Sequence, residues 1–188
     1  MTFKNKLIIG AIAGIMLFLI ILLIILLSNS AKDENKSAAG ILKCEYYIQT
    51  AKSATQIISK EFSQIEGIKI YIKGNKIDFT REYQFDSLGQ IEVNITVPES
   101  IDMKKMFKDV ESLTKITLYS DKNCKITSLE STFENCKNLR DINIINFDTS
   151  QVSSFKKAFY GTNLEDLTKL DINTKNVEDM SYMLLIQN

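Results

Sequence analysis

The chain has 188 residues, of which 24% are charged and 45% hydrophobic, and its 23 basic and 23 acidic residues give a formal net charge of zero. This composition excludes an intrinsically disordered tail, because disorder requires low hydrophobicity and a high net charge. It also excludes a nucleic-acid-binding protein, because such a protein requires a basic surface.

The first feature along the chain is an apolar run, LIIGAIAGIMLFLIILLIILL, from Leu7 to Leu27. A helix of this length, rising about 1.5 Å per residue, covers the roughly 30 Å hydrocarbon core of a bilayer. We therefore expect residues 7–27 to form a transmembrane signal-anchor helix in contact with the lipid bilayer. The alternative is a cleaved signal peptide, whose apolar region is usually shorter, about 7 to 15 residues.

The charges that flank this run predict its orientation. Lys4 and Lys6 precede it without an acidic neighbour, and positive flanks stay in the cytoplasm. We therefore expect residues 1–6 to be a cytoplasmic tail of a single-pass protein of the cell membrane, with the C-terminal region extracytoplasmic. The following residues 28–40, SNSAKDENKSAAG, are small and polar, which is typical of a flexible stalk.

Residues 41–98 predict a small antiparallel β domain. In IKIYI, KGNK and IDF, apolar and polar residues alternate around a turn, and YQFDSLGQIEVNITV has a glycine between two alternating stretches. Such alternation is the period of a half-buried strand, and the second stretch predicts a hairpin. For residues 48–66 an amphipathic helix is an open alternative, because apolar residues there recur at spacings of three and four.

From Met103 onward, five apolar positions recur together every 26 residues, and then every 25. The clearest position holds Phe107, Phe133, Phe159 and Leu184. We expect Phe133 to be buried between Phe107 and Phe159, because equivalent residues of a repeat array stack on one another. The other four positions hold Leu113, Leu139 and Leu164; Ile116, Ile142 and Leu167; Ile126, Val152 and Val177; and Met103, Leu129, Phe155 and Met180.

The repeats also share short phrases, LTKITL, LRDINI and LEDLTK, and the longer NFDTSQVSSFKKAF and INTKNVEDMSYML. Residues 103–188 therefore resemble the BspA-like leucine-rich repeats, also called the bacterial surface protein 26-residue repeat. The resemblance implies a solenoid of about three and a half units over residues 99–188, which binds proteins or mediates adhesion at the cell surface without catalysis. The chain departs from the family's asparagine ladder, because that column holds Asp121, Phe147 and Ile172.

If the repeats stack as parallel strands, the residues between the buried ones point outward and form a binding face. Polar and apolar groups mix on this face, which suits a protein or a glycan better than a small molecule. The predicted face comprises Lys115, Thr117, Tyr119, Asp141, Asn143, Ile145, Asp166, Thr168 and Leu170.

The cysteines and asparagines add two minor expectations. Cys44, Cys124 and Cys136 are an odd number, so at most one bridge forms within the chain; we expect core packing for Cys136, with a Cys124–Cys136 disulfide as the alternative. The tripeptides NKS at Asn35 and NIT at Asn94 match the N-glycosylation pattern, which applies only in a eukaryote.

Catalytic chemistry finds little support in the sequence. The chain contains no histidine, which excludes His-based triads and most zinc sites. Since no nucleotide-binding or nucleophile motif is present either, we expect no enzyme, no cofactor, no metal and no nucleic-acid partner.

Together these observations predict a single-pass, membrane-anchored protein. Its outer part should be a small antiparallel β domain followed by a short leucine-rich-repeat-like solenoid, mainly β with short helical turns. Its expected function is adhesion or another interaction with an extracellular protein or glycan. Two alternatives stay open: a truncated, non-functional fragment of a longer surface repeat protein, and an extracytoplasmic enzyme on an unrecognised scaffold.

Overall fold

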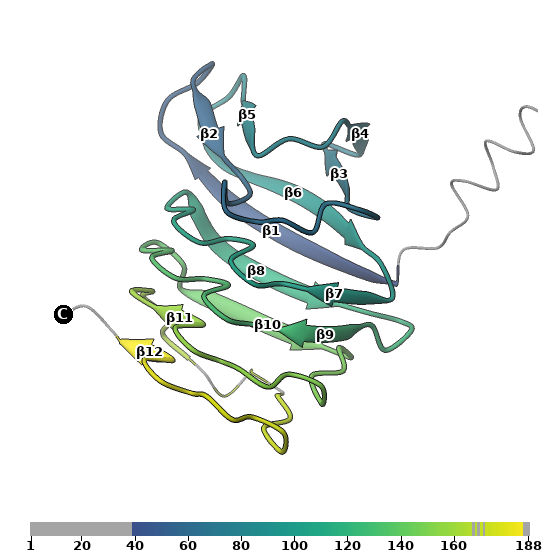
Figure 1. Ribbon diagram of the computed structural model, residues 1–188. Helices are drawn as coiled ribbons and strands as arrows, with labels where there is room; N and C mark the ends of the chain where they lie inside the picture. Colours follow the sequence, from purple (N-terminus) through teal and green to yellow (C-terminus); the bar gives the residue numbers. More distant parts are fainter. Residues whose placement is uncertain (1–38, 167, 169, 171, 186–188) are drawn as a thin grey trace, which may run out of the picture. The chain divides into compact units, whose positions relative to one another are not determined.

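The computed structural model describes residues 39–166, 168, 170 and 172–185. Within these residues the chain forms strands, turns and loops but no helix (Figure 1). Seven strands precede or begin the repeats: β1 (Gly40–Ile48), β2 (Ala54–Gln56), β3 (Lys69–Ile72), β4 (Asn75–Ile77), β5 (Glu82–Gln84), β6 (Gly89–Val97) and β7 (Ser100–Asp102). The other five are β8 (Leu113–Tyr119), β9 (Lys125–Ser128), β10 (Asp141–Ile145), β11 (Phe159–Tyr160) and β12 (Leu184–Leu185).

The main sheet has six strands in the order β10-β8-β1-β6-β3-β4. All neighbours run antiparallel except β8 and β10, which are parallel. Side chains alternate between a buried inner face and a partly exposed outer face, as the period of a strand requires. The inner face holds the fully buried residues Leu42, Cys44, Tyr46, Val93, Ile95, Ile116 and Ile142.

Part of the region before Pro98 folds as its alternation predicts. β3 and β4 form a hairpin in which Ile72 pairs with Asn75, and the connecting Lys73 and Gly74 both have positive φ. This is the conformation that a two-residue hairpin turn requires. Gly40, predicted to end the stalk, is instead the first residue of β1.

Two expectations for this region are wrong. β5 pairs with β2, while β6 pairs with β1 and β3, so the hairpin predicted around Gly89 does not form. The helix considered for residues 48–66 is also absent, because that segment holds β2 and loops. The buried Ile57, Ile58 and Phe62 of this segment pack into the core from irregular backbone.

The repeats stack through backbone hydrogen bonds that join each unit to the next. The amides of Phe107, Phe133 and Phe159 donate to the carbonyls of Thr132, Ala158 and Met183, each at 2.9 Å. Because bonds of this kind recur one repeat apart, equivalent side chains lie directly above one another.

The phenylalanine position forms a continuous stack. The ring centroids of Phe107 and Phe133 are 5.6 Å apart, and those of Phe133 and Phe159 are 5.7 Å apart, with the rings parallel. All three side chains are at most 1% exposed. The prediction that Phe133 is buried between its two equivalents is therefore confirmed.

Each repeat turns through residues with a left-handed backbone, at two positions of the unit. The first position, which recurs at the repeat spacing, has φ between 52° and 59° and holds Lys105, Ser131, Lys157 and Tyr182. The second position lies four residues later, where Asp109, Asn135 and Gly161 have φ of 60°, 60° and 70°. A residue with positive φ interrupts a right-handed helix, so the predicted helical turns are replaced by tight turns.

The predicted fold class is wrong in its main points. The residues that the structure describes contain no helix and do not close a solenoid, and the first repeat strand, β8, pairs antiparallel with β1. One sheet therefore joins the regions before and after Pro98. The repeat spacing shows which residues stack, but it carries no information on the strand that covers the first repeat. The predicted domain limits stay a prediction.

The third repeat also differs from the expectation. Of its predicted strand, residues 164–166 and 168 lie in loop and turn, and no strand is present there in the described part of the chain. The amides of Asn163 and Glu165 nevertheless donate to the carbonyls of Leu139 and Arg140, at 3.1 and 3.2 Å. The third unit thus begins alongside the second without continuing the sheet.

The expected membrane span, residues 7–27, lies outside the described residues, as do the predicted cytoplasmic tail and most of the stalk. Where the structure does describe the chain, it contains no helix of the length and apolar character needed to cross a bilayer. The structure therefore does not support the predicted single-pass anchor or the cell-membrane localisation that was inferred from it.

Replacing Phe133 tests the stack. Phe133→Ala should lower the free energy of unfolding by about 3 to 5 kcal/mol, the usual cost of truncating a buried phenylalanine. Asn143→Ala on the half-exposed outer face should cost under about 0.5 kcal/mol. Urea denaturation followed by circular dichroism measures both values, and equal costs would contradict the stacked arrangement.

Gly161 tests the left-handed turn. An added Cβ would lie 2.9 Å from the Asn135 side-chain oxygen, whereas at Gly74, which also has positive φ, it would meet nothing within 4 Å. Gly74→Ala should therefore cost only the backbone penalty, about 1 to 2 kcal/mol, and Gly161→Ala should cost more. Urea denaturation measures the free energy of unfolding of both variants. If Gly161→Ala lowers it by no more than Gly74→Ala does, the close contact with Asn135 is refuted.

Candidate functional site

The predicted binding face forms in its first two repeats. The parallel register of β8 and β10 pairs Lys115 with Asp141, Thr117 with Asn143, and Tyr119 with Ile145. Five of these side chains are half-buried, and Tyr119 is 42% exposed. These six residues therefore lie in three rows on the outer face of the sheet.

The third repeat does not extend these rows. Asp166 and Thr168 are exposed and bond to each other, the Thr168 hydroxyl donating to an Asp166 carboxylate oxygen at 2.6 Å. Leu170 is half-buried and packs against the core. The structure therefore brings together six of the nine predicted residues as a paired surface.

Strands β1 and β6 extend the rows in the other direction. On β1, Lys43 lies opposite Thr117 and Glu45 opposite Lys115. The Lys115 ammonium is 3.5 Å from the Asp141 carboxylate and 3.7 Å from the Glu45 carboxylate, so one cation joins three strands. We define the outer face as Lys43, Glu45, Tyr47, Gln90, Glu92, Asn94, Lys115, Thr117, Tyr119, Asp141, Asn143 and Ile145.

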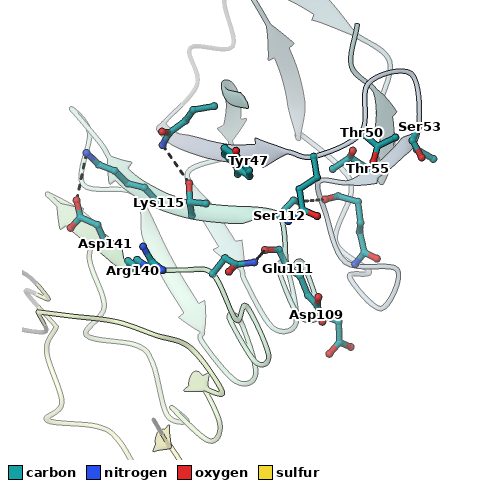
Figure 2. Close-up of a pocket in the computed structure, with 16 residues that line it drawn as sticks. Tyr47, Thr50, Ser53, Thr55, Asp109, Glu111, Ser112, Lys115, Arg140 and Asp141 are labelled. Atoms are coloured by element: carbon teal, nitrogen blue, oxygen red, sulfur yellow. Dashed lines mark hydrogen bonds and ion pairs between the residues drawn. The ribbon is translucent and has the colours of Figure 1, made fainter. Parts of the chain in front are cut away.

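One end of the outer face opens into a groove of about 850 Å³ (Figure 2). The first wall is formed by the end of β1, the loop after it, β2 and Gln90 of β6. The second wall is formed by loops of the first two repeats and by the first residues of β8 and β10. The first wall holds Tyr47, Gln49, Thr50, Ser53, Ala54, Thr55, Gln56 and Gln90. The second holds Asp109, Glu111, Ser112, Thr114, Lys115, Asn138, Arg140 and Asp141.

Hydrogen bonds hold the two walls together. The Tyr47 amide donates to the Ser112 carbonyl at 2.8 Å, and the Ser112 hydroxyl donates to the Gln56 carbonyl at 2.9 Å. The Thr114 hydroxyl donates to the Glu45 carbonyl at 3.0 Å. The backbone on both sides of the groove is therefore held in place by hydrogen bonds.

Most charges in the groove are already paired. The Lys137 ammonium lies 2.6 Å from Glu111, and this neighbour raises the pKa of Lys137 above its usual value. The Asn135 amide donates to Asp109 at 2.8 Å, and Lys115 pairs with Asp141. Arg140 differs, because its guanidinium has no hydrogen bond or ion pair with any residue that the structure describes.

The three cysteines are free and buried, so the Cys124–Cys136 disulfide is not formed in the structure. The Cys124 thiol donates to the Pro98 carbonyl and the Cys136 thiol to the Phe107 carbonyl, both at 3.0 Å. Burial raises the pKa of Cys124 to about 12 and raises the pKa values of Cys44 and Cys136 further. Thiols in this state are poor nucleophiles.

Of the two predicted glycosylation sites, the structure describes only Asn94. Asn35 lies outside the described residues. Asn94 lies in the middle of β6, half-buried, where its amide donates to Glu92 at 2.8 Å. Its side-chain oxygen is buried without a partner among the described residues. The described residues also contain no group of three or more acidic, cysteine or histidine side chains that could hold a metal.

Sequence reasoning missed the contribution of β1, β6 and the loop after β1 to this site. Tyr47, Gln49 and Gln90 lie outside the repeats and share no spacing with them. Alternation along β1 and β6 could have indicated that Tyr47 and Gln90 face outward, but it carries no information on which residues lie beside them.

Residues 101–186 match the family described as Mycoplasma protein of unknown function, DUF285. The match covers the repeats but not β1, β2 or β6, which form the other wall of the groove. No leucine-rich repeat family matches the chain, so the predicted membership of the BspA-like leucine-rich repeats is wrong. No curated protein and no solved structure matches the chain.

Thiol titration tests the cysteine assignment. In the native full chain, the three thiols should react with a disulfide reagent orders of magnitude more slowly than an exposed thiol, because they are buried and protonated. In denaturant without reductant, all three should react. Absorbance of the released chromophore counts them, and a count of one would show that a disulfide has formed.

Proposed function

We propose that the chain is a non-catalytic binding module that engages a protein or a glycan through its outer face. The observation that supports this is the register of β1, β6, β8 and β10, which places different side chains in cross-strand rows. Neighbouring strands lie about 4.8 Å apart, so a partner meets a closely spaced pattern of charged, amide, hydroxyl and aromatic groups.

The chemistry of the face favours recognition over reaction. Three of its charges form the chain Asp141–Lys115–Glu45, and Gln90 donates to Glu45 at 2.5 Å. Side chains that hold one another in this way are preorganised, which lowers the entropy cost of binding a partner.

An enzyme is the second candidate, because the groove contains the three carboxylates of Asp109, Glu111 and Asp141. Each of them already accepts a hydrogen bond or an ion pair from Asn135, Lys137 or Lys115. An acid–base pair needs carboxylates in contrasting environments, whereas all three are engaged by a donor. Binding is therefore the function that the geometry favours.

A bulky substitution in the middle of the outer face tests the proposal. Thr117→Arg should weaken binding of the full chain by at least about tenfold, because it disrupts the central row. Ser153→Arg, at an exposed position outside the four strands that form this face, is the matched control and should leave affinity unchanged. Binding is measured by surface plasmon resonance against purified extracellular-matrix proteins and an oligosaccharide array.

Two results would contradict the proposal. Equal effects of Thr117→Arg and Ser153→Arg would place binding elsewhere on the chain. Failure of the folded chain to bind any protein or saccharide of the panel would argue against a binding module.

A further inference from the structure

We propose that the groove of Figure 2 binds a neutral oligosaccharide, with a sugar ring packed on Tyr47 and sugar hydroxyls bound by Arg140 and the surrounding amides. This inference rests on the proposed function and names the ligand class of one end of the outer face. The volume of about 850 Å³ lies within the range of about 300–1,000 Å³ that ligand sites occupy.

The lining argues against a protein ligand. Protein interfaces depend on apolar and aromatic anchors that fill desolvated pockets. Among the described residues that line the groove, Ala54 is the only aliphatic one and Tyr47 the only aromatic one. The other lining residues carry hydroxyl, amide or charged groups, which match a ligand that has hydroxyls on most of its carbons.

Tyr47 provides the aromatic surface. Its side chain is 53% exposed, and its backbone is fixed between Gln90 of β6 and the Ser112 carbonyl. The face of a sugar ring that carries only C–H groups is apolar and packs on such an aromatic ring. A tyrosine side chain loses little conformational entropy when it binds, because it has only two χ angles.

The polar groups that line the groove with Tyr47 stand on backbone that is fixed before any ligand arrives. The Asn138 amide donates to the Glu111 carbonyl at 2.9 Å, which leaves its side-chain oxygen as an acceptor. The Arg140 backbone is held by the Thr114 carbonyl at 3.0 Å, while its guanidinium keeps its donors for a ligand. Adjacent sugar hydroxyls fit this planar fork of donors.

The balance of charge favours a neutral sugar over an acidic one. Three carboxylates, Asp109, Glu111 and Asp141, line the groove against two cations, Lys115 and Arg140. Their ion-pair partners add one charge of each sign, Lys137 on Glu111 and Glu45 on Lys115, so one negative charge stays in excess. A ligand carboxylate would therefore meet like charges, and like charges at close range are unfavourable.

Calorimetry of the full chain tests the inference with neutral hexasaccharides built from glucose, mannose, xylose and N-acetylglucosamine. Hexagalacturonate is the acidic comparison. At least one neutral probe should bind, and its affinity should change less than about twofold between low and high salt, because no net charge is neutralised.

Tyr47→Ala should weaken binding at least about tenfold, whereas Tyr47→Phe, which keeps the ring, should stay near the parent. Arg140→Ala should also weaken it, and circular dichroism confirms that each variant is folded.

Three outcomes would overturn the inference: no binding of any neutral probe, preference for hexagalacturonate, or an unchanged affinity in both Tyr47→Ala and Arg140→Ala. These outcomes are separate from failure of the proposed function. Thr117 does not line the groove, so a chain that binds a protein partner, loses it in Thr117→Arg and binds no neutral probe would support the outer face while refuting the saccharide site.

Discussion

The backbone bonds between equivalent positions of successive repeats are the constraint on which the rest of the structure depends. The phenylalanine amides donate across the units at 2.9 Å, and this sets the register of the other equivalent positions of the repeats. The rings of Phe107, Phe133 and Phe159 then stack at 5.6 and 5.7 Å. A single unit could not bury its phenylalanine, because each ring is covered by the ring of the next unit.

The first repeat has no preceding unit to pair with, and β1 covers the exposed edge of its strand β8. The antiparallel pairing of β1 with β8 supplies the hydrogen bonds that a preceding repeat would otherwise provide. A parallel repeat sheet and an antiparallel sheet therefore share one core, which runs from Ile70 through Tyr46 to Ile142. The groove lies where the loop after β1 meets the loops of the repeats, so it is a consequence of this junction.

The sequence predicts the stacked residues well and their surroundings poorly. The row of Phe107, Phe133 and Phe159 could be predicted because identical spacing implies vertical contact. The pairing of Lys115 with Asp141 follows from the same spacing. The left-handed turns could not be predicted, because Lys105 and Ser131 are not residue types that favour positive φ. The pairing of β1 with β8 leaves no periodic signal, so this junction between the β domain and the repeats could not be predicted.

The two walls of the groove place different demands on the sequence. The repeat wall, with Asn138 and Arg140, is held by bonds that recur from unit to unit, so its backbone follows from stacking. The other wall, with Tyr47 and Gln49, belongs to no repeat, and its side chains are free to differ without disturbing the stack. The proposed saccharide site uses both walls, because Tyr47 would pack on the sugar ring from this wall and Arg140 would donate to its hydroxyls from the repeat wall. No described residue after Asp141 lines the groove, so the third repeat, which bonds to the second, does not form part of it.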